Sequence, residues 1–144
     1  MKTSGRILAL DLGAKRIGVA VTDELQMTAR GVSVFTRETT EKLLAAVQKL
    51  IEDFDAVALV IGLPLNFDGS ESAGAIDARA IADYLTQNLS IPVYLQDERL
   101  TSREAEENLR ERGFNQKEIK KLVDQEAAAI ILNDFLAMNT SNAN

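Results

Sequence analysis

The chain has 144 residues, 46% of them apolar, so its length and composition favour one domain over residues 1–144 with a single core. Sixteen Lys and Arg against 22 Asp and Glu leave a net charge of −6, so any contact with nucleic acid must be local. The absence of His and Cys excludes a Ser-His-Asp triad, a thiol nucleophile, disulfides and a zinc site built on imidazole or thiolate. Oxygen ligands remain, and these favour Mg²⁺ or Mn²⁺.

The first 36 residues predict three short strands. An apolar run over residues 6–12 ends at Gly13, and apolar and small residues alternate over residues 16–22 and again over 30–36. The link over residues 13–15 has the length of a hairpin turn. Three successive strands this close together predict an antiparallel meander.

From residue 40 onward, helical and strand patterns alternate. The spacing of apolar residues predicts a helix over 40–54, a buried strand over 57–61 and a turn-rich loop over 66–72. A helical stripe over 76–85 and a fifth strand over 91–95 follow. This order predicts right-handed crossovers and parallel pairing of the later strands.

The last third of the chain predicts helices only. Thr101 and Glu104 fit a capping box for a helix over 102–112, which Gly113 ends. A short turn starting at Asn115, a last helix to about residue 138 and a frayed polar tail follow. No apolar run approaches the ~20 residues that cross a bilayer, and no apolar leader follows Met1, so we expect a cytoplasmic protein without membrane contact.

Acidic residues interrupt three elements that are otherwise apolar, and a buried carboxylate is costly unless its charge is compensated. Asp11 lies in the first strand between two leucines. The alternative to a functional role is that it ends the strand and is bonded to the hairpin turn. Asp97 and Glu98 follow the fifth strand, where open α/β sheets bind ligands, or they form an exposed cluster. Asp124 shares a helical line with Ala128, or it is the cap or first-turn acid of the last helix.

Convergence of these acids on one or two divalent cations would supply the missing compensation. Two metals about 4 Å apart can activate water and stabilise the leaving oxygen in phosphodiester hydrolysis, so no imidazole base is required. Basic residues near the acids could bind phosphate, although surface cations usually serve only solvation. The candidates are Lys15 and Arg16 at the hairpin tip, extended by Arg30, Arg99 and Arg103.

Four segments carry a resemblance to a known family: residues 8–20 (LALDLGAKRIGVA), 61–66 (IGLPLN) with 68–70 (DGS), 97–101 (DERLT) and 124–129 (DQEAAA). Together they resemble the YqgF family, also called RuvX, of Holliday junction resolvase-like nucleases. The match spans nearly the whole chain, and four motifs in the right order are far more specific than any one of them.

The resemblance implies an α/β fold of the ribonuclease H-like type, with a mixed five-stranded sheet, strands 1–3 antiparallel and helices on both faces. It also implies catalytic acids that hold Mg²⁺ or Mn²⁺, which map onto Asp11, Glu98 and Asp124, with Asp97 as the alternative middle ligand. Better known members of the superfamily take that middle acid from the fourth strand, where this chain has residues 62–64 (GLP).

The implied activity is processing of the 5′ end of precursor 16S ribosomal RNA in ribosome biogenesis. The alternatives are cleavage of branched DNA at Holliday junctions, and a module that binds nucleic acid or the ribosome without catalysis. A resolvase that makes paired cuts should be a two-fold dimer, and no apolar helix face indicates one, so we expect a monomer or a weak homodimer. Asn66 of the second motif joins the candidate nucleic-acid-binding residues.

Overall fold

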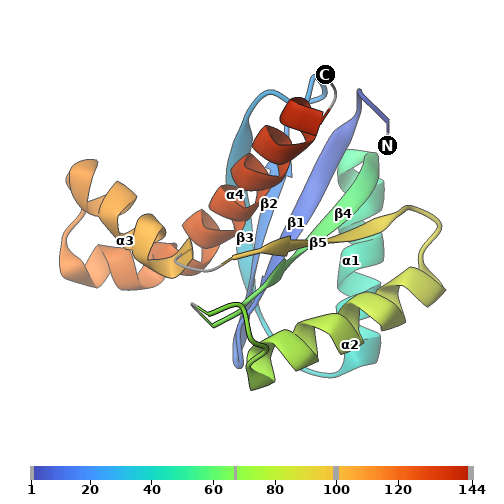
Figure 1. Ribbon diagram of the computed structural model, residues 1–144, viewed down its shortest axis with the longest axis horizontal. Helices are drawn as coiled ribbons and strands as arrows, with labels where there is room; N and C mark the ends of the chain where they lie inside the picture. The colour runs from blue at the N-terminus through green and yellow to red at the C-terminus, as the bar shows by residue number, and fades with distance from the viewer. Residues whose placement is uncertain (1, 67, 99–100, 143–144) are drawn as a thin grey trace.

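Five strands form one mixed sheet in the order β3-β2-β1-β4-β5 (Figure 1). β1 pairs antiparallel with β2 and β2 with β3, whereas β4 is parallel to β1 and β5 is parallel to β4. The predicted meander and the predicted parallel pairing are therefore confirmed. The strands are β1 (Arg6–Leu12), β2 (Arg16–Thr22), β3 (Ala29–Thr36), β4 (Ala56–Leu63) and β5 (Val93–Asp97).

The computed structural model describes residues 2–66, 68–98 and 101–142. Within its last two helices, the side chains of residues 101–105, 120, 121, 123–125 and 140–142 lie outside the description. The capping box expected at Thr101 and Glu104 therefore lies outside the described side chains.

Helices cover both faces of the sheet (Figure 1). α1 (Thr40–Phe54) and α2 (Ala73–Asn88) pack on one face, and α4 (Gln116–Asn142) packs on the other. α3 (Thr101–Glu111) extends away from the sheet and packs against the start of α4 (Figure 1). Gly113 ends α3 with a positive φ of 92°, as predicted. In the described part of the chain, no helix has the length and apolar character to span a membrane.

Strand alternation sorts large and small side chains onto different faces. On β1, Leu8 and Leu10 face α1 and α2, whereas Ile7 and Ala9 face α4. The face under α4 is rich in alanine from both the sheet and the helix, which lets the helix lie close to the strands. By the same alternation, Asp11 belongs to the face under α4.

Several boundaries differ by a few residues from the sequence-based expectation, and β4 in particular continues through Gly62 to Leu63. Two of the differences bear on the predicted acids. β5 starts at Val93 because Pro92 has no N–H for a ladder bond, although its carbonyl accepts from Leu59 (3.0 Å). The strand also extends two residues beyond its predicted end, so Asp97 is its last residue and does not follow it, which corrects the prediction.

The second difference concerns the last helix. Residues 116–142 contain no Gly or Pro and form one helix, in place of the predicted turn and shorter helix. Asn115 and Glu118 form a reciprocal capping box at its start: the Glu118 N–H donates to Asn115 Oδ1 (2.9 Å) and the Asn115 N–H donates to Glu118 Oε1 (3.0 Å). Asp124 therefore lies inside α4, and the alternative that it caps a helix or sits in a first turn is wrong.

Candidate active site

The carboxyl groups of Asp11 and Glu98 meet at the carboxyl end of the parallel strands. Asp11 is the last but one residue of β1 and pairs in register with Gly18 of β2. Glu98 directly follows β5, and its N–H donates to the carbonyl of Leu63 in β4 (3.1 Å). The two side chains are hydrogen-bonded to each other. Since β4 lies between β1 and β5, the Glu98 side chain crosses β4 to reach Asp11.

Gly62 of β4 makes this crossing possible. A β-carbon at position 62 would lie 2.6 Å from Oε2 of Glu98 and 2.6 Å from Cδ1 of Ile131 in α4. Contacts this short do not occur between real side chains, so any residue but glycine would force the carboxyl group or the isoleucine to move. Gly62 stands in the strand from which related enzymes are expected to supply their middle acid. Here the strand leaves the space through which Glu98, at the end of β5, reaches Asp11.

The close approach changes the protonation of the pair. Burial raises the pKa of Glu98 to about 9, and the negative charge of Asp11, the hydrogen bond with Asp11 and the charge of Asp97 act in the same direction. Glu98 therefore keeps its proton at neutral pH, and the pair carries less negative charge than two free carboxylates would. A bound cation would take over the role of that proton.

The other two predicted acids are placed differently. Asp97 pairs in register with Leu63, and successive strand residues point to opposite faces, so its neighbour Glu98 is the residue that meets Asp11. Asp124 lies in α4 one turn before the fully buried Ala128, and its side chain is outside the description. Among the side chains that the structure describes, no group of three or more acidic residues is arranged to hold a metal ion.

Two of the predicted basic residues follow Asp11 closely in the sequence. Lys15 and Arg16 are exposed in the hairpin between β1 and β2, only a few residues after Asp11. The Gly13 N–H donates to the Arg16 carbonyl (2.9 Å) and closes the turn. Residues 13–16 line an open hollow of about 220 Å³.

The remaining basic candidates are not brought to the acids in the described structure. Arg30 pairs in register with Val21, away from the hairpin, and its guanidinium lies 6.0 Å from the centre of the Phe54 ring at the end of α1. It therefore belongs to the α1 face of the sheet, opposite to Asp11. Arg99 lies outside the described residues, and so does the side chain of Arg103.

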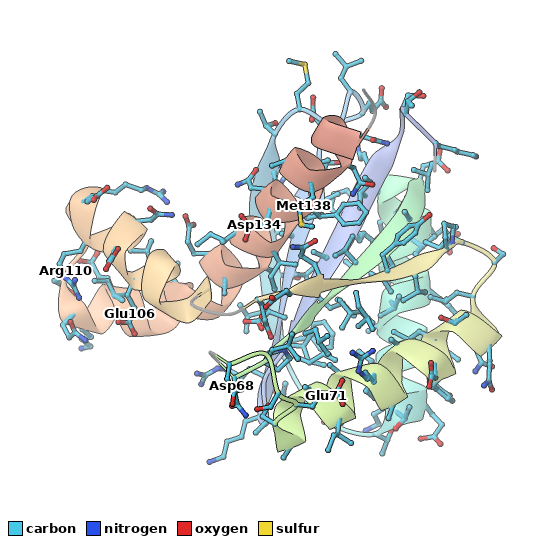
Figure 2. All side chains as sticks on the ribbon, viewed as in Figure 1. Asp68, Glu71, Glu106, Arg110, Asp134 and Met138 are labelled. Atoms are coloured by element: carbon cyan, nitrogen blue, oxygen red, sulfur yellow. The ribbon has the colours of Figure 1, made fainter. Side chains whose placement is uncertain are left out.

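Asn66 lies in a hydrogen-bonded loop between β4 and α2. Its side-chain amide donates to Ser70 Oγ (3.0 Å), and both the N–H and the hydroxyl of Ser70 donate to Asp68 Oδ1 (2.8 and 2.6 Å). Figure 2 shows Asp68 on this loop and Glu71 near the start of α2, at the carboxyl end of β4. The composition predicted a loop, and the structure adds that its polar side chains bind one another.

Sequence reasoning missed two contributors to this end of the sheet. Gly62 lies outside the predicted strand over 57–61, although β4 includes it and the lack of an acid in the fourth strand was a signal that another residue must take that place. Arg37, which joins the hairpin to α2, received no role, because no local pattern marks it.

The comparisons with known proteins now decide the family. A family model described as "RuvX: Holliday junction resolvase" matches residues 5–138. The chain belongs to the RuvX family. Two curated RuvX relatives carry the name "Putative pre-16S rRNA nuclease": a protein of Anaeromyxobacter sp. (strain Fw109-5) is 47% identical over 131 residues, and one of Natranaerobius thermophilus is 42% identical over 139 residues. The alignments cover 91% and 96% of this chain, and 96% and 99% of the two relatives.

Solved structures agree on the fold. RuvC of T. thermophilus in complex with a Holliday junction substrate aligns with a TM-score of 0.60 at 20% identity, over 94% of this chain and 97% of that one. The fowlpox virus Holliday junction resolvase aligns with a TM-score of 0.53 at 12% identity, over 92% and 99% of the two chains. The expected ribonuclease H-like α/β fold of this RuvX chain is thereby confirmed.

Proposed function

We propose that this RuvX protein is a nuclease that hydrolyses phosphodiester bonds of structured RNA in the processing of the 5′ end of pre-16S rRNA, in the cytoplasm. The observation that carries the proposal is the Asp11–Glu98 carboxyl pair, which two strands bring together over Gly62 at the carboxyl end of the sheet. The names of the curated relatives support the nuclease activity and the choice of RNA.

The donor set of the site fits Mg²⁺ or Mn²⁺. Carboxylate oxygens are the ligands that these ions prefer, and a partly buried pair of acids that retains a proton is stabilised when a dication replaces that proton. Asp11 and Glu98 would hold the ion together with Asp124, which α4 carries one turn before the buried Ala128. The ion would activate water and stabilise charge on the phosphate and the leaving oxygen.

The chain's own residues position the substrate. Asp11 lies in β1 and Glu98 directly follows β5, so the sheet gives both carboxyl groups a rigid base. Lys15 and Arg16 would bind phosphates of the RNA strand next to the scissile bond, since their hairpin follows Asp11 directly. Replacing both by alanine should weaken RNA affinity for all sequences and reduce its salt dependence, because phosphate contacts carry no sequence information.

The decisive test is Asp11→Asn, which preserves shape and removes the charge. We expect the variant to fold as the wild type does and to lose Mg²⁺-dependent cleavage of a pre-16S 5′-end RNA. Asp83→Asn, an exposed acid of α2, is the matched control and should cleave normally. Unchanged cleavage by Asp11→Asn would refute the assignment.

The same assay separates the alternatives. A four-way DNA junction offered beside the RNA tests the resolvase activity. If the junction is cleaved faster than the RNA, branched DNA is the substrate and the RNA assignment is wrong. For a module that only binds, the double variant Asp11→Asn, Asp124→Asn should retain both RNA affinity and cellular function.

A further inference from the structure

Arg37 joins three segments that lie far apart in the sequence. It follows β3 directly, and its two terminal nitrogens donate to both carboxylate oxygens of Asp77 in α2, at 2.8 and 2.7 Å. The nitrogen Nη1 also donates to the Gly13 carbonyl (3.1 Å), and the Arg37 N–H donates to the Lys15 carbonyl (2.9 Å). One residue therefore binds both ends of the turn at residues 13–15 and ties that turn to α2.

The geometry of this contact is stricter than that of an ordinary surface ion pair. The planar guanidinium meets the carboxylate through two parallel hydrogen bonds, an arrangement that lysine cannot reproduce. The Arg37 side chain is only 20% exposed, whereas the exposed pair of Lys49 and Asp53 on α1 shows 75% and 49%. A hairpin fixed in this way has less freedom to shift relative to the strands and to α2.

The position of this hairpin matters for the proposed chemistry. Gly13 comes two residues after Asp11, and the exposed Lys15 and Arg16 follow it at once. A small displacement of the hairpin would move both cations relative to the Asp11–Glu98 pair. Misplacement of binding groups by about 1 Å can cost up to about 100-fold in rate.

We propose that Arg37 and Asp77 are positioning residues, which clamp the β1–β2 hairpin so that Lys15 and Arg16 meet the phosphates of the RNA. This inference rests on the proposed function. It assigns Arg37 no direct contact with RNA, and it gives the acidic Asp77 a favourable effect on the binding of a polyanion.

The expected effect of Asp77 on RNA affinity has the opposite sign to that of an ordinary surface acid, and this difference can be tested. Removing an acid from a protein surface normally strengthens the binding of RNA, because a repulsive charge is lost. Asp77→Ala should instead weaken binding by about tenfold, because the freed hairpin no longer presents its cations correctly. Asp83→Ala removes an exposed acid from the same helix and should leave affinity unchanged or slightly higher.

A set of Arg37 variants shows whether the clamp acts through the hairpin. Arg37→Lys retains the charge but not the fork, so we expect the same loss of affinity as in Arg37→Ala. In the background of Lys15→Ala and Arg16→Ala, Arg37→Ala should cause no further loss, because the residues through which it acts are already gone. Lys49→Ala, which breaks the exposed pair on α1, is the control for removal of a paired cation.

Binding is measured by fluorescence anisotropy with a labelled RNA hairpin that carries a single-stranded 5′ tail, at fixed salt and without divalent ions. Urea unfolding checks that each variant is folded, and Asp77→Asn, which keeps volume and one acceptor, replaces Asp77→Ala if the latter does not fold.

The clamp is overturned if Asp77→Ala binds as tightly as Asp83→Ala, if Arg37→Lys binds like the wild type, or if the losses of affinity from Arg37→Ala and from the hairpin substitutions add. A wild type that binds RNA but does not cleave it when Mg²⁺ or Mn²⁺ is added refutes the proposed nuclease and leaves the clamp standing, whereas a wild type that does not bind RNA refutes both.

Discussion

Glu98→Gln should make the metal-free protein more stable at neutral pH. The pKa of Glu98 is about 9 in the folded protein and 4.5 in the unfolded chain. Folding therefore takes up a proton at any pH between these two values. The contribution of Glu98 to stability is complete below pH 4.5 and falls as the pH rises toward 9. Glutamine cannot ionise, and its amide can still donate to Asp11, so the variant avoids this loss.

The magnitude follows from the same two values. Within the window each pH unit costs about 1.4 kcal/mol, so the loss at pH 7 would reach about 3 kcal/mol for a fully shielded group. Glu98 is only partly buried, and solvent reduces the effect, so we expect Glu98→Gln to gain about 1–3 kcal/mol at pH 7. At pH 4 the two proteins should be equally stable.

The assay is urea unfolding followed by far-ultraviolet circular dichroism at several pH values between 4 and 8, with a chelator present. The chain has no His, so few other groups titrate between about pH 6 and pH 8, and the other carboxyl groups are the same in wild type and variant. Glu106→Gln is the control, because Glu106 is exposed on α3, away from the sheet (Figure 2). The reasoning fails if wild type and Glu98→Gln lose stability in parallel between pH 5 and pH 8, or if Glu106→Gln gains as much.

Three further predictions concern the same site. Without metal, Asp11→Asn removes one cause of the raised pKa of Glu98, so it should raise the melting temperature by about 2–4 °C for each kcal/mol of that cost relieved, as measured by scanning calorimetry. Mn²⁺ at about 100 times its dissociation constant should stabilise the wild type by about 2.7 kcal/mol, and Asp11→Asn by much less, in thermal shift assays. Gly62→Ala should displace Glu98 and reduce cleavage by about 100-fold with unchanged circular dichroism. Adding Ile131→Val removes only the second of the two close contacts and should not restore the activity.

Local signals in the sequence were sufficient for the elements of the fold. The alternation of side chains marked the strands, Gly13 and Gly113 marked a hairpin and a helix end, and the change of period at residue 40 marked α1. These signals are local because backbone hydrogen bonds and the burial of one face are decided within a few residues. The resemblance of four motifs added the family, which the comparisons confirm.

The tertiary structure decided which of these residues meet. Glu98 is hydrogen-bonded to Asp11, because it directly follows β5 at the point where Gly62 leaves room above β4. Arg30 lies on the face opposite to Asp11. Such pairings depend on strand order and register, and a change of one residue in register turns a side chain to the other face of the sheet.

The pairing of Arg37 with Asp77 is the clearest case. The two residues are 40 positions apart, Arg37 follows a strand and Asp77 lies in an alanine-rich helix, and neither breaks a local pattern. Their contact exists because the end of β3, the β1–β2 hairpin and the start of α2 are brought to one end of the sheet. A single sequence records the chemistry of such groups but not the distance between them, since that distance is set by the packing of the whole chain.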